Sequence, residues 1–373
     1  MTSQNNQDLQ LAHQLQSKVL TNYQTSHDMI HYAFATIEGL HLTCDFVVYS
    51  AALYGSPPNY NPTPVGLHEV YRQPYETLGR IPFSEYSRFG SISYMDDLTL
   101  QALKDVPNRT MKDFTSVLFE IELDKPGYVS TLDSQMNYGL LQKLIEKGER
   151  ILDAIRLFLF TPGENKSIGR VGAIGNGISG VWLGDDGKNA KFIARKTSQY
   201  QLSQAPVEVN LANVQRIYNN QIFKELCSAA SLDTEHDFLL NRIFQSLRAY
   251  RESRDIQSME ARFRQLATIA EHLAKRNENE RIFGKKVYGP IAQIAQKGWH
   301  TEDDFLSVVT DLWKNTRDPL SHSVETFASI GRNPMSDILK IERVVVNMIE
   351  AVVIAWRNEQ FGIDAYDSLL ESK

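Results

Sequence analysis

Several features that would assign a chain to a class are missing from this one. There are two cysteines, Cys44 and Cys227, and no C-x-x-C pair, so the sequence indicates neither a disulfide framework nor a zinc knuckle. The 39 Lys+Arg residues are outnumbered by 45 Asp+Glu, so no overall basic field can hold a polyanion. Any contact with nucleic acid must therefore come from a local patch of charge.

Long apolar segments are also absent. The longest apolar run covers residues 351–356, far fewer than the roughly 20 residues needed to cross a bilayer. The first ten residues have neither a basic nor an apolar region, and they resemble a polar tail rather than a signal peptide. These absences predict a cytoplasmic protein in a reducing compartment, without membrane contact.

Proline and glycine are distributed unevenly along the chain. Ten of the 13 prolines lie at or before Pro206, and 16 of the 21 glycines lie at or before Gly187. In this first half, apolar residues come in short runs bounded by turn residues, which is typical of strands. We expect strands within 42–54, 114–123 and 156–160, a hairpin over 181–193, one helix at about 138–158, and a long ordered loop at 57–82.

The second half has apolar residues at helical spacing instead. We expect helices near 212–230, 233–254, 258–277, 287–297, 301–316, 319–330 and 336–361. The last is apolar nearly all round between Val344 and Ile354, which predicts either the centre of a bundle or half of a dimer seam. The expected fold class is α+β, with a β-rich N-terminal domain over 1–210 and an all-α bundle over 211–373.

The first half of the sequence contains only weak evidence for a catalytic or binding site. Residues 175–180 match G-x-G-x-x-G, but a strand and a turn follow instead of the helix that a dinucleotide site needs. Glu120, Glu122 and Asp124 alternate on one face of a strand, which could hold a nuclease metal, but the solvent-facing side of a half-buried strand shows the same pattern and is the favoured interpretation. The histidines, including His27 and His31, lack the spacing of metal ligands. We expect no metal site and no cofactor.

The string N-T-R-D-P-L-S-H, residues 315–322, carries a stronger signal. Asp318 precedes a proline, which favours an N-cap at Asp318 with Pro319 in the first helical position. In that register Arg317 and His322 occupy the two positions whose side chains meet across a helix start. An arginine and a histidine at a helix N-terminus form a site for phosphate, with a proton donor or acceptor beside it. The alternative is an ordinary cap with two polar neighbours.

The R-D-P-L-S-H string resembles the signature of the HEPN superfamily, and the helices expected over 233–363 resemble the HEPN domains that end ApeA-like prokaryotic defence proteins. The resemblance implies a metal-independent endoribonuclease that leaves a 2′,3′-cyclic phosphate. His322 would be the general base or acid, Arg317 would bind the phosphate, and Asp318 would orient one of them or cap the helix. Val324 stands where one variant of the motif has tyrosine, which disfavours the nucleotidyltransferase-regulated toxins.

The resemblance also implies partners. They are RNA, either tRNA or mRNA, and a second copy in a homodimer formed by the helical domain. The setting would be antiviral defence by abortive infection, with a possible phage-derived trigger sensed by the N-terminal domain. The alternatives are a non-catalytic HEPN module that binds RNA or a nucleotide, and a metal nuclease at Glu120 and Glu122.

A local basic patch for RNA is present in the sequence. Residues 242–286 hold 11 basic residues against 6 acidic ones. This excess suits a groove leading to Arg317. It also suits a solvated helix face with ion pairs such as Glu271 with Lys275. The candidate RNA-binding residues are Arg248, Arg251, Arg262, Lys275, Lys285 and Lys286.

Overall fold

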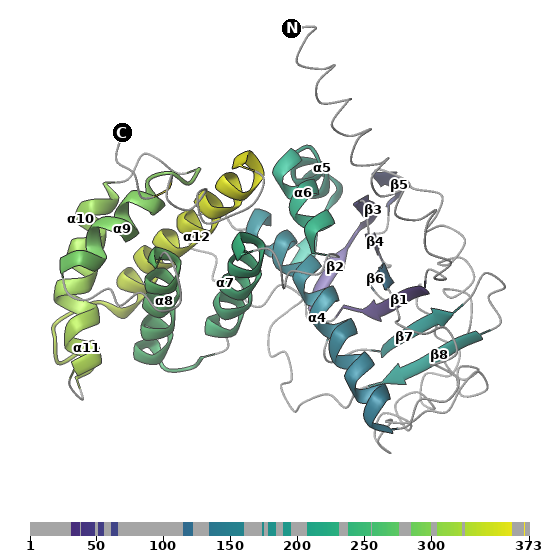
Figure 1. Ribbon diagram of the computed structural model, residues 1–373, viewed down its shortest axis with the longest axis horizontal. Coiled ribbons are helices and arrows are strands. Elements are labelled where there is room, and N and C mark those ends of the chain that lie inside the picture. The colour runs from purple at the N-terminus through teal and green to yellow at the C-terminus, as the bar shows by residue number, and fades with distance from the viewer. Residues whose placement is uncertain are drawn as a thin grey trace, which may run out of the picture.

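The computed structural model describes residues 31–37, 39–48, 51–55, 61–65, 115–121, 134–159, 174, 178–183, 189–194, 207–230, 238–254, 256–275, 285–299, 304–322, 325–359 and 369. Strands lie in the N-terminal half and helices fill the C-terminal half, with one long helix, α4, between them (Figure 1). The expected α+β class is therefore confirmed, with helix predominating over sheet in the described residues. None of the described helices is both long and apolar enough to span a membrane.

A seven-stranded sheet forms the N-terminal part. Its strands run in the order β5-β3-β4-β6-β1-β7-β8, all antiparallel to their neighbours except the parallel pair β3 and β5. A second, two-stranded sheet pairs β2 with β9 in parallel. The strands are β1 His31–Thr36, β2 Leu40–Leu42, β3 Cys44–Val48, β4 Ala51–Tyr54, β5 Asn61–Val65, β6 Ser116–Ile121, β7 Ile178–Leu183, β8 Asn189–Ala194 and β9 Val207–Val209.

The sheet confirms part of the sequence pattern. The strand expected over 114–123 is β6, and the run 42–54 forms the hairpin β3–β4. The hairpin expected over 181–193 is β7–β8, whose register brings Leu183 opposite Asn189. The loop expected over 57–82 contains strand β5. Several of the expectations concern residues outside those described: the turn at 185–187 within the hairpin, residues 175–177 of the G-x-G-x-x-G match, Glu122, Asp124 and His27.

Helix α4, Ser134–Leu159, covers the segment where both a helix and a strand were expected. The helix over 138–158 is confirmed, and the strand at 156–160 is wrong for residues 156–159. The physical reason is that the apolar residues continue the helical period to the end of α4, where Ile151, Ile155 and Leu157 are buried. The period of a long helix outweighs a short apolar run at its end.

The C-terminal half is helical from residue 211, where the domain boundary was placed. The expected helix over 212–230 is divided in two, because the Asn220 side chain accepts the backbone N–H groups of Ile222 and Phe223 and starts a new helix. The helices are α5 Leu211–Tyr218, α6 Gln221–Ala229, α7 Phe238–Arg254, α8 Met259–Ala274, α9 Lys285–Ala295, α10 Phe305–Leu312, α11 Asp318–His322 and α12 Pro334–Glu359.

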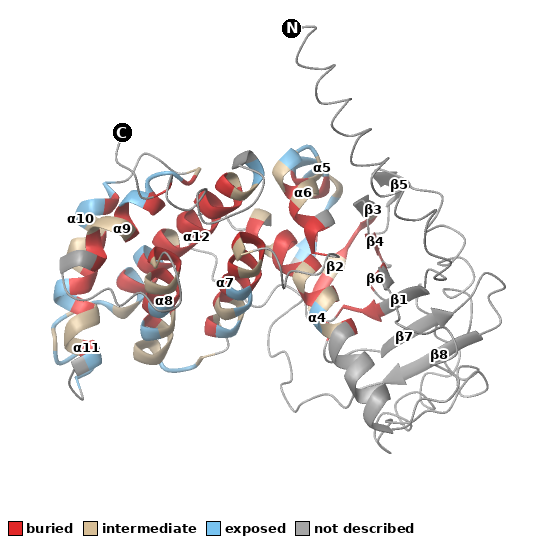
Figure 2. Ribbon diagram, viewed as in Figure 1, coloured by how far each residue is buried: buried red, intermediate tan, exposed pale blue. Residues whose placement is uncertain are grey.

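Helix α12 is the centre of the bundle. It packs against α6, α7, α8, α9 and α10, and buried residues run along it between the other helices (Figure 2). Val344, Val345, Val346 and Ile349 are fully buried. The apolar stretch of α12 that begins at Val344 is therefore covered by helices of the same chain, as the first of the two alternatives for this helix predicts.

A buried ionic cluster joins α4 to α7. The Arg251 guanidinium lies 2.6 Å from Asp153 and 3.2 Å from Glu149, and Arg156 lies 2.5 and 2.9 Å from the same two carboxylates. Burial raises the pKa of Asp153, while the two arginines act in the opposite direction. Removing one member would leave an uncompensated buried charge, so the cluster fixes how α4 packs on the bundle.

A second buried carboxylate, Glu350 on α12, gives a testable stability effect. One oxygen accepts the Trp299 backbone N–H at 3.1 Å, and burial raises the pKa of Glu350 from 4.5 to about 8. The folded state therefore keeps a proton that the unfolded state releases, and stability from this group falls as the pH rises from 4.5 to 8. Glu350→Gln should raise the free energy of unfolding by about 2–4 kcal/mol at alkaline pH and change it little near the unfolded pKa. Urea unfolding at acidic and alkaline pH measures this difference; a gain of equal size at both would contradict it.

Candidate functional site

The segment that holds Arg317, Asp318 and His322 is one continuous helix. Helix α10 passes directly into a π-helical turn, η4 Trp313–Arg317, and this passes into α11. Asp318 has helical backbone angles, φ −64° and ψ −46°, and its N–H donates to the Trp313 carbonyl. The expected N-cap at Asp318 is therefore wrong. The N-cap of this helix is Asp304, whose side chain accepts the Ser307 N–H.

Pro319 explains the π turn. In a regular α-helix the proline ring would clash with the carbonyl four residues earlier, and its missing N–H would break the hydrogen-bond ladder. One wider turn before the proline relieves both problems and lets the helix continue. The structure therefore overrides the preference of a residue before proline for extended backbone.

Two further expectations depended on an N-cap at Asp318, and they are also wrong. No helix begins at Asp318, so the helix dipole and free N–H groups invoked for anion binding are not available there. Arg317 and His322 are five positions apart on a continuous helix, about 140° around its axis, rather than in the facing positions of a helix start. His322 is the last residue of α11, and its side chain lies outside the described residues.

Arg317 is held by two carboxylates. Glu271 on α8 takes one edge of the guanidinium, with Nε to Oε1 at 2.8 Å and Nη2 to Oε2 at 3.2 Å. Asp318 Oδ1 lies 3.2 Å from Nη1. The Glu271 fork has the two-point geometry that fixes a guanidinium in orientation as well as position. Arg317 remains 26 % exposed, so it is fixed and still accessible.

Two aromatic residues contact the carboxylates that hold Arg317. Trp313, buried in η4, donates its indole N–H to Glu271 at 3.1 Å, so Glu271 is itself fixed. Tyr288 on α9 places its hydroxyl 3.5 Å from Asp318 Oδ2. Burial and the Asp318 charge raise the pKa of Tyr288, so its hydroxyl is a proton donor toward that carboxylate. Asp318 therefore contacts both Arg317 and Tyr288, and it does not cap a helix.

The other side of the π turn is anchored to the start of α12. Thr316 is fully buried and donates its hydroxyl to Asp337 at 2.8 Å. Arg332 forks onto Asp337, at 2.8 and 2.9 Å, and onto Asp311, at 2.7 and 3.1 Å. Arg332 hydrogen bonds lower the pKa of Asp311. Arg317 thus projects from a turn held on both flanks, which is how a site residue is kept in place.

Three of the candidate RNA-binding residues are paired with carboxylates of this chain. Arg251 is engaged by the buried carboxylates of α4, and Arg262 by the buried Glu342 of α12. Arg248 is exposed and pairs with Glu252 one turn along α7, at 2.9 Å. Lys275 ends α8, and its carbonyl accepts the Arg242 guanidinium. Lys285 and Lys286 begin α9, with side chains outside the described residues.

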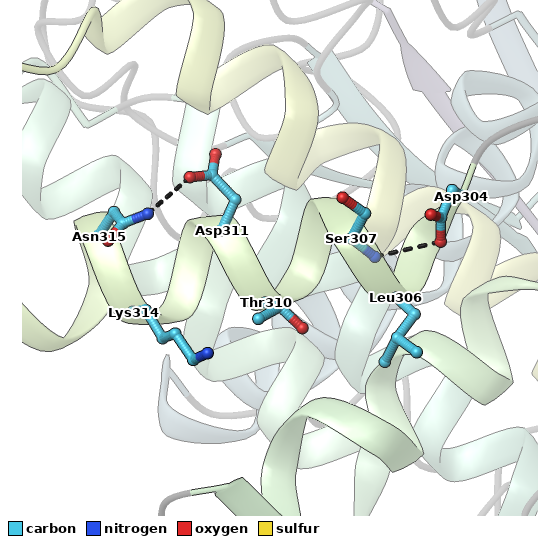
Figure 3. Close-up of a pocket in the computed structure, with 7 residues that line it drawn as sticks. All are labelled: Asp304, Leu306, Ser307, Thr310, Asp311, Lys314 and Asn315. Carbon is cyan, nitrogen blue, oxygen red and sulfur yellow. Dashed lines mark hydrogen bonds between the residues drawn. The ribbon is translucent and has the colours of Figure 1, made fainter.

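A separate hollow of about 460 Å³ lies on the outer surface of α10 and η4 (Figure 3). Two of its polar pairs are already bonded to each other, Asn315 to Asp311 and the Ser307 N–H to Asp304. Neither Arg317 nor Glu271 lines it, so it is not part of the site described above. Its lining residues are Asp304, Leu306, Ser307, Thr310, Asp311, Lys314 and Asn315.

Three site residues escaped the sequence analysis: Glu271, Trp313 and Tyr288. Glu271 was considered only as an ion-pair partner of Lys275 on the same helix, but it binds Arg317, 46 positions away. One available signal was Trp313, whose polar N–H needs a partner when a tryptophan is buried. Within the described ranges no group of three or more His, Cys, Asp or Glu side chains could hold a metal ion.

Comparison with known proteins gives no further assignment. No protein-family model, curated protein or solved structure matches the chain. The function has to be argued from the site itself.

Proposed function

We propose that this protein is a metal-independent endoribonuclease of the HEPN type, with its site at Arg317, Asp318 and His322. The observation that supports this most is the guanidinium of Arg317, held on one edge by Glu271 and exposed in part to solvent. A fixed guanidinium is the group that binds a phosphodiester and stabilises the charge that develops on it. The R-D-P-L-S-H sequence adds a histidine to the same helix.

The chemistry follows from those groups. The ribose 2′-hydroxyl attacks the adjacent phosphorus, the bond to the 5′-oxygen of the next nucleotide breaks, and a 2′,3′-cyclic phosphate forms. A base accepts the proton of the 2′-hydroxyl, and an acid gives a proton to the leaving 5′-oxygen. His322 is proposed as one of these two groups, because imidazole changes charge near neutral pH.

The charge around Arg317 determines how a phosphate would enter. Glu271 contacts the Nε edge with two hydrogen bonds, whereas Asp318 makes one contact at 3.2 Å and is 40 % exposed. Displacing Asp318 therefore costs less than displacing Glu271. We propose that the phosphate takes the place of Asp318 on the guanidinium while Glu271 stays bound.

The proposal includes a homodimer formed by the helical domain. Arg317 and His322 diverge around one helix, so two copies of that helix would bring Arg317 of one copy to His322 of the other. Activity should then fall with dilution as the dimer dissociates. Sedimentation and cleavage measured over the same concentration range test this; full activity in a strictly monomeric protein would contradict it.

One alternative has support of its own. Since Glu271 and Asp318 compensate the charge of Arg317, the site could bind RNA or a nucleotide without cleaving it. Glu120 lies in β6, whereas Glu122 lies outside the described residues, so the structure adds nothing to the metal-nuclease alternative. The resemblance also supports antiviral defence by abortive infection as the setting, with the N-terminal half responding to a phage-derived trigger.

Binding and cleavage of mixed-sequence RNA by the full-length chain distinguish the enzyme from the module. The enzyme proposal predicts that RNA is both bound and cut, and that cutting continues in EDTA. RNA that is bound but never cut would favour the module. Cutting that stops in EDTA would favour a metal nuclease.

A further inference from the structure

One face of α8 runs beside η4 and α11. Residues three or four apart on a helix share a face, and Glu260, Arg264, Thr268 and Glu271 follow this spacing. Three of them contact the neighbouring segment. Glu260 accepts the Phe327 N–H at 3.3 Å, Arg264 donates to the Leu320 carbonyl at 3.0 Å, and Glu271 binds Arg317. This face of α8 therefore lies against the segment that carries Arg317.

Arg264 differs from the arginines on α7 and α8 that the sequence singled out. Arg251 and Arg262 are neutralised by buried carboxylates, and Arg248 pairs with Glu252. Arg264 is exposed, and its guanidinium donates a hydrogen bond to the neutral backbone carbonyl of Leu320. Within the part of the chain that the structure describes, no carboxylate compensates its positive charge by direct contact.

The carboxylate nearest to Arg264 in sequence on this face of α8, that of Glu260, already accepts other hydrogen bonds. Glu260 accepts the N–H of Phe327 and the hydroxyl of Ser258, and the surrounding N–H groups, its own first, lower the pKa of Glu260. Arg264 adds to that lowering from a distance. Arg264 is thus a positive group held in a fixed direction by the Leu320 carbonyl and open to an anion from solvent.

The spacing between Arg264 and Arg317 suits one strand of nucleic acid. Leu320, which fixes Arg264, is three residues after Arg317 on the neighbouring helix, about 4.5 Å along its axis. Arg264 is seven residues before Glu271 on α8, about 10 Å along that helix. The guanidinium groups of Arg264 and Arg317 therefore lie where α8 meets the segment that carries Arg317, within reach of phosphates in one short oligonucleotide.

We propose that Arg264 binds a second phosphate of the RNA whose scissile phosphate is held by Arg317. This inference rests on the proposed function and extends it to the substrate class: an oligonucleotide with several phosphates, rather than a mononucleotide or a cyclic nucleotide. Thr268, an exposed residue of α8 whose hydroxyl donates to the Arg264 carbonyl at 2.9 Å, lies between Arg264 and Glu271 along this helix.

The test is Arg264→Gln in the full-length chain, with mixed-sequence RNA hexanucleotides and dinucleotides as substrates. A dinucleotide has a single phosphate between its nucleosides, so it cannot use the second contact. The variant should lose about tenfold in kcat/KM on hexanucleotides and keep its activity on dinucleotides. The slope of log(kcat/KM) against log salt on hexanucleotides should fall by about 0.7, the value for one phosphate contact on a single strand.

Arg216→Gln is the matched control, because Arg216 is an exposed arginine on α5, which does not pack against α8. It should leave the hexanucleotide rate and its salt slope unchanged. If Arg264→Gln behaves like this control, or loses activity equally on both substrates, the second contact is refuted and the proposed function stands. If the wild type cleaves no RNA, both proposals fall together.

Discussion

His322→Ala should reduce the rate of RNA cleavage by about 10²–10⁴-fold while the affinity for RNA stays within a few-fold of wild type. General acid or base catalysis by a positioned side chain contributes this much to a rate, and alanine can neither accept nor donate the proton. Binding is retained because Arg317 and Arg264, which would contact phosphates, are untouched. Initial cleavage rates and RNA affinity, measured on the same preparation, check both halves of the prediction.

Ser321→Ala is the control for this change. Ser321 is exposed and is the residue before His322 in α11, so its replacement tests whether any alteration of this turn impairs the protein. It should retain wild-type cleavage. A His322→Ala protein that cleaves RNA at the wild-type rate would remove His322 from the mechanism and would leave the binding-module alternative as the better account of the helical domain.

Arg317→Lys should lower kcat/KM by about 10²–10³-fold, because the loss of one stabilising donor of developing charge costs about this much. Lysine keeps the charge but lacks the planar fork, so it cannot bind both oxygens of Glu271 and still offer a fixed donor to the phosphate. The loss should appear mainly in kcat, since a mobile ammonium still attracts the substrate. Single-turnover cleavage at saturating RNA measures it.

Lys314→Gln is the companion variant for Arg317→Lys. Lys314 is exposed on the same π turn and lines the hollow on the outer surface, which Glu271 does not line (Figure 3). It should change kcat/KM by less than twofold. If Arg317→Lys is equally mild, the fork between Glu271 and Arg317 has a structural role alone, and the phosphate is bound elsewhere.

The parts of the fold that the sequence predicted well are those set by local periodicity. Helix α12 and strand β6 are long enough for their apolar pattern to identify them, and β7 and β8 are joined by a turn sequence typical of hairpins. The helix expected over 319–330 is wrong for residues 325–330, and the reason is local as well. Thr326 and Ser329 bond each other's backbone N–H groups and hydroxyls, which competes with helix.

The candidate site shows why the rest could not be predicted. The rule for a residue before proline is a preference of the isolated backbone, and at Asp318 packing overrode it. Thr316 is tied to Asp337 and Trp313 to Glu271, so the turn before Pro319 is held in helical form by residues far away in sequence. Counting charges over 242–286 had the same weakness, because it could not distinguish Arg262, which is paired with Glu342, from Arg264.

The most direct test of the account is the chemistry of the new RNA ends. Full-length protein is incubated with mixed-sequence RNA in excess EDTA, and the products are identified by mass spectrometry. The account predicts cleavage as fast as without EDTA, with 2′,3′-cyclic phosphate and 5′-hydroxyl ends that are missing from the His322→Ala reaction. Cleavage abolished by EDTA, or ends with a 5′-phosphate and a 3′-hydroxyl, would contradict it.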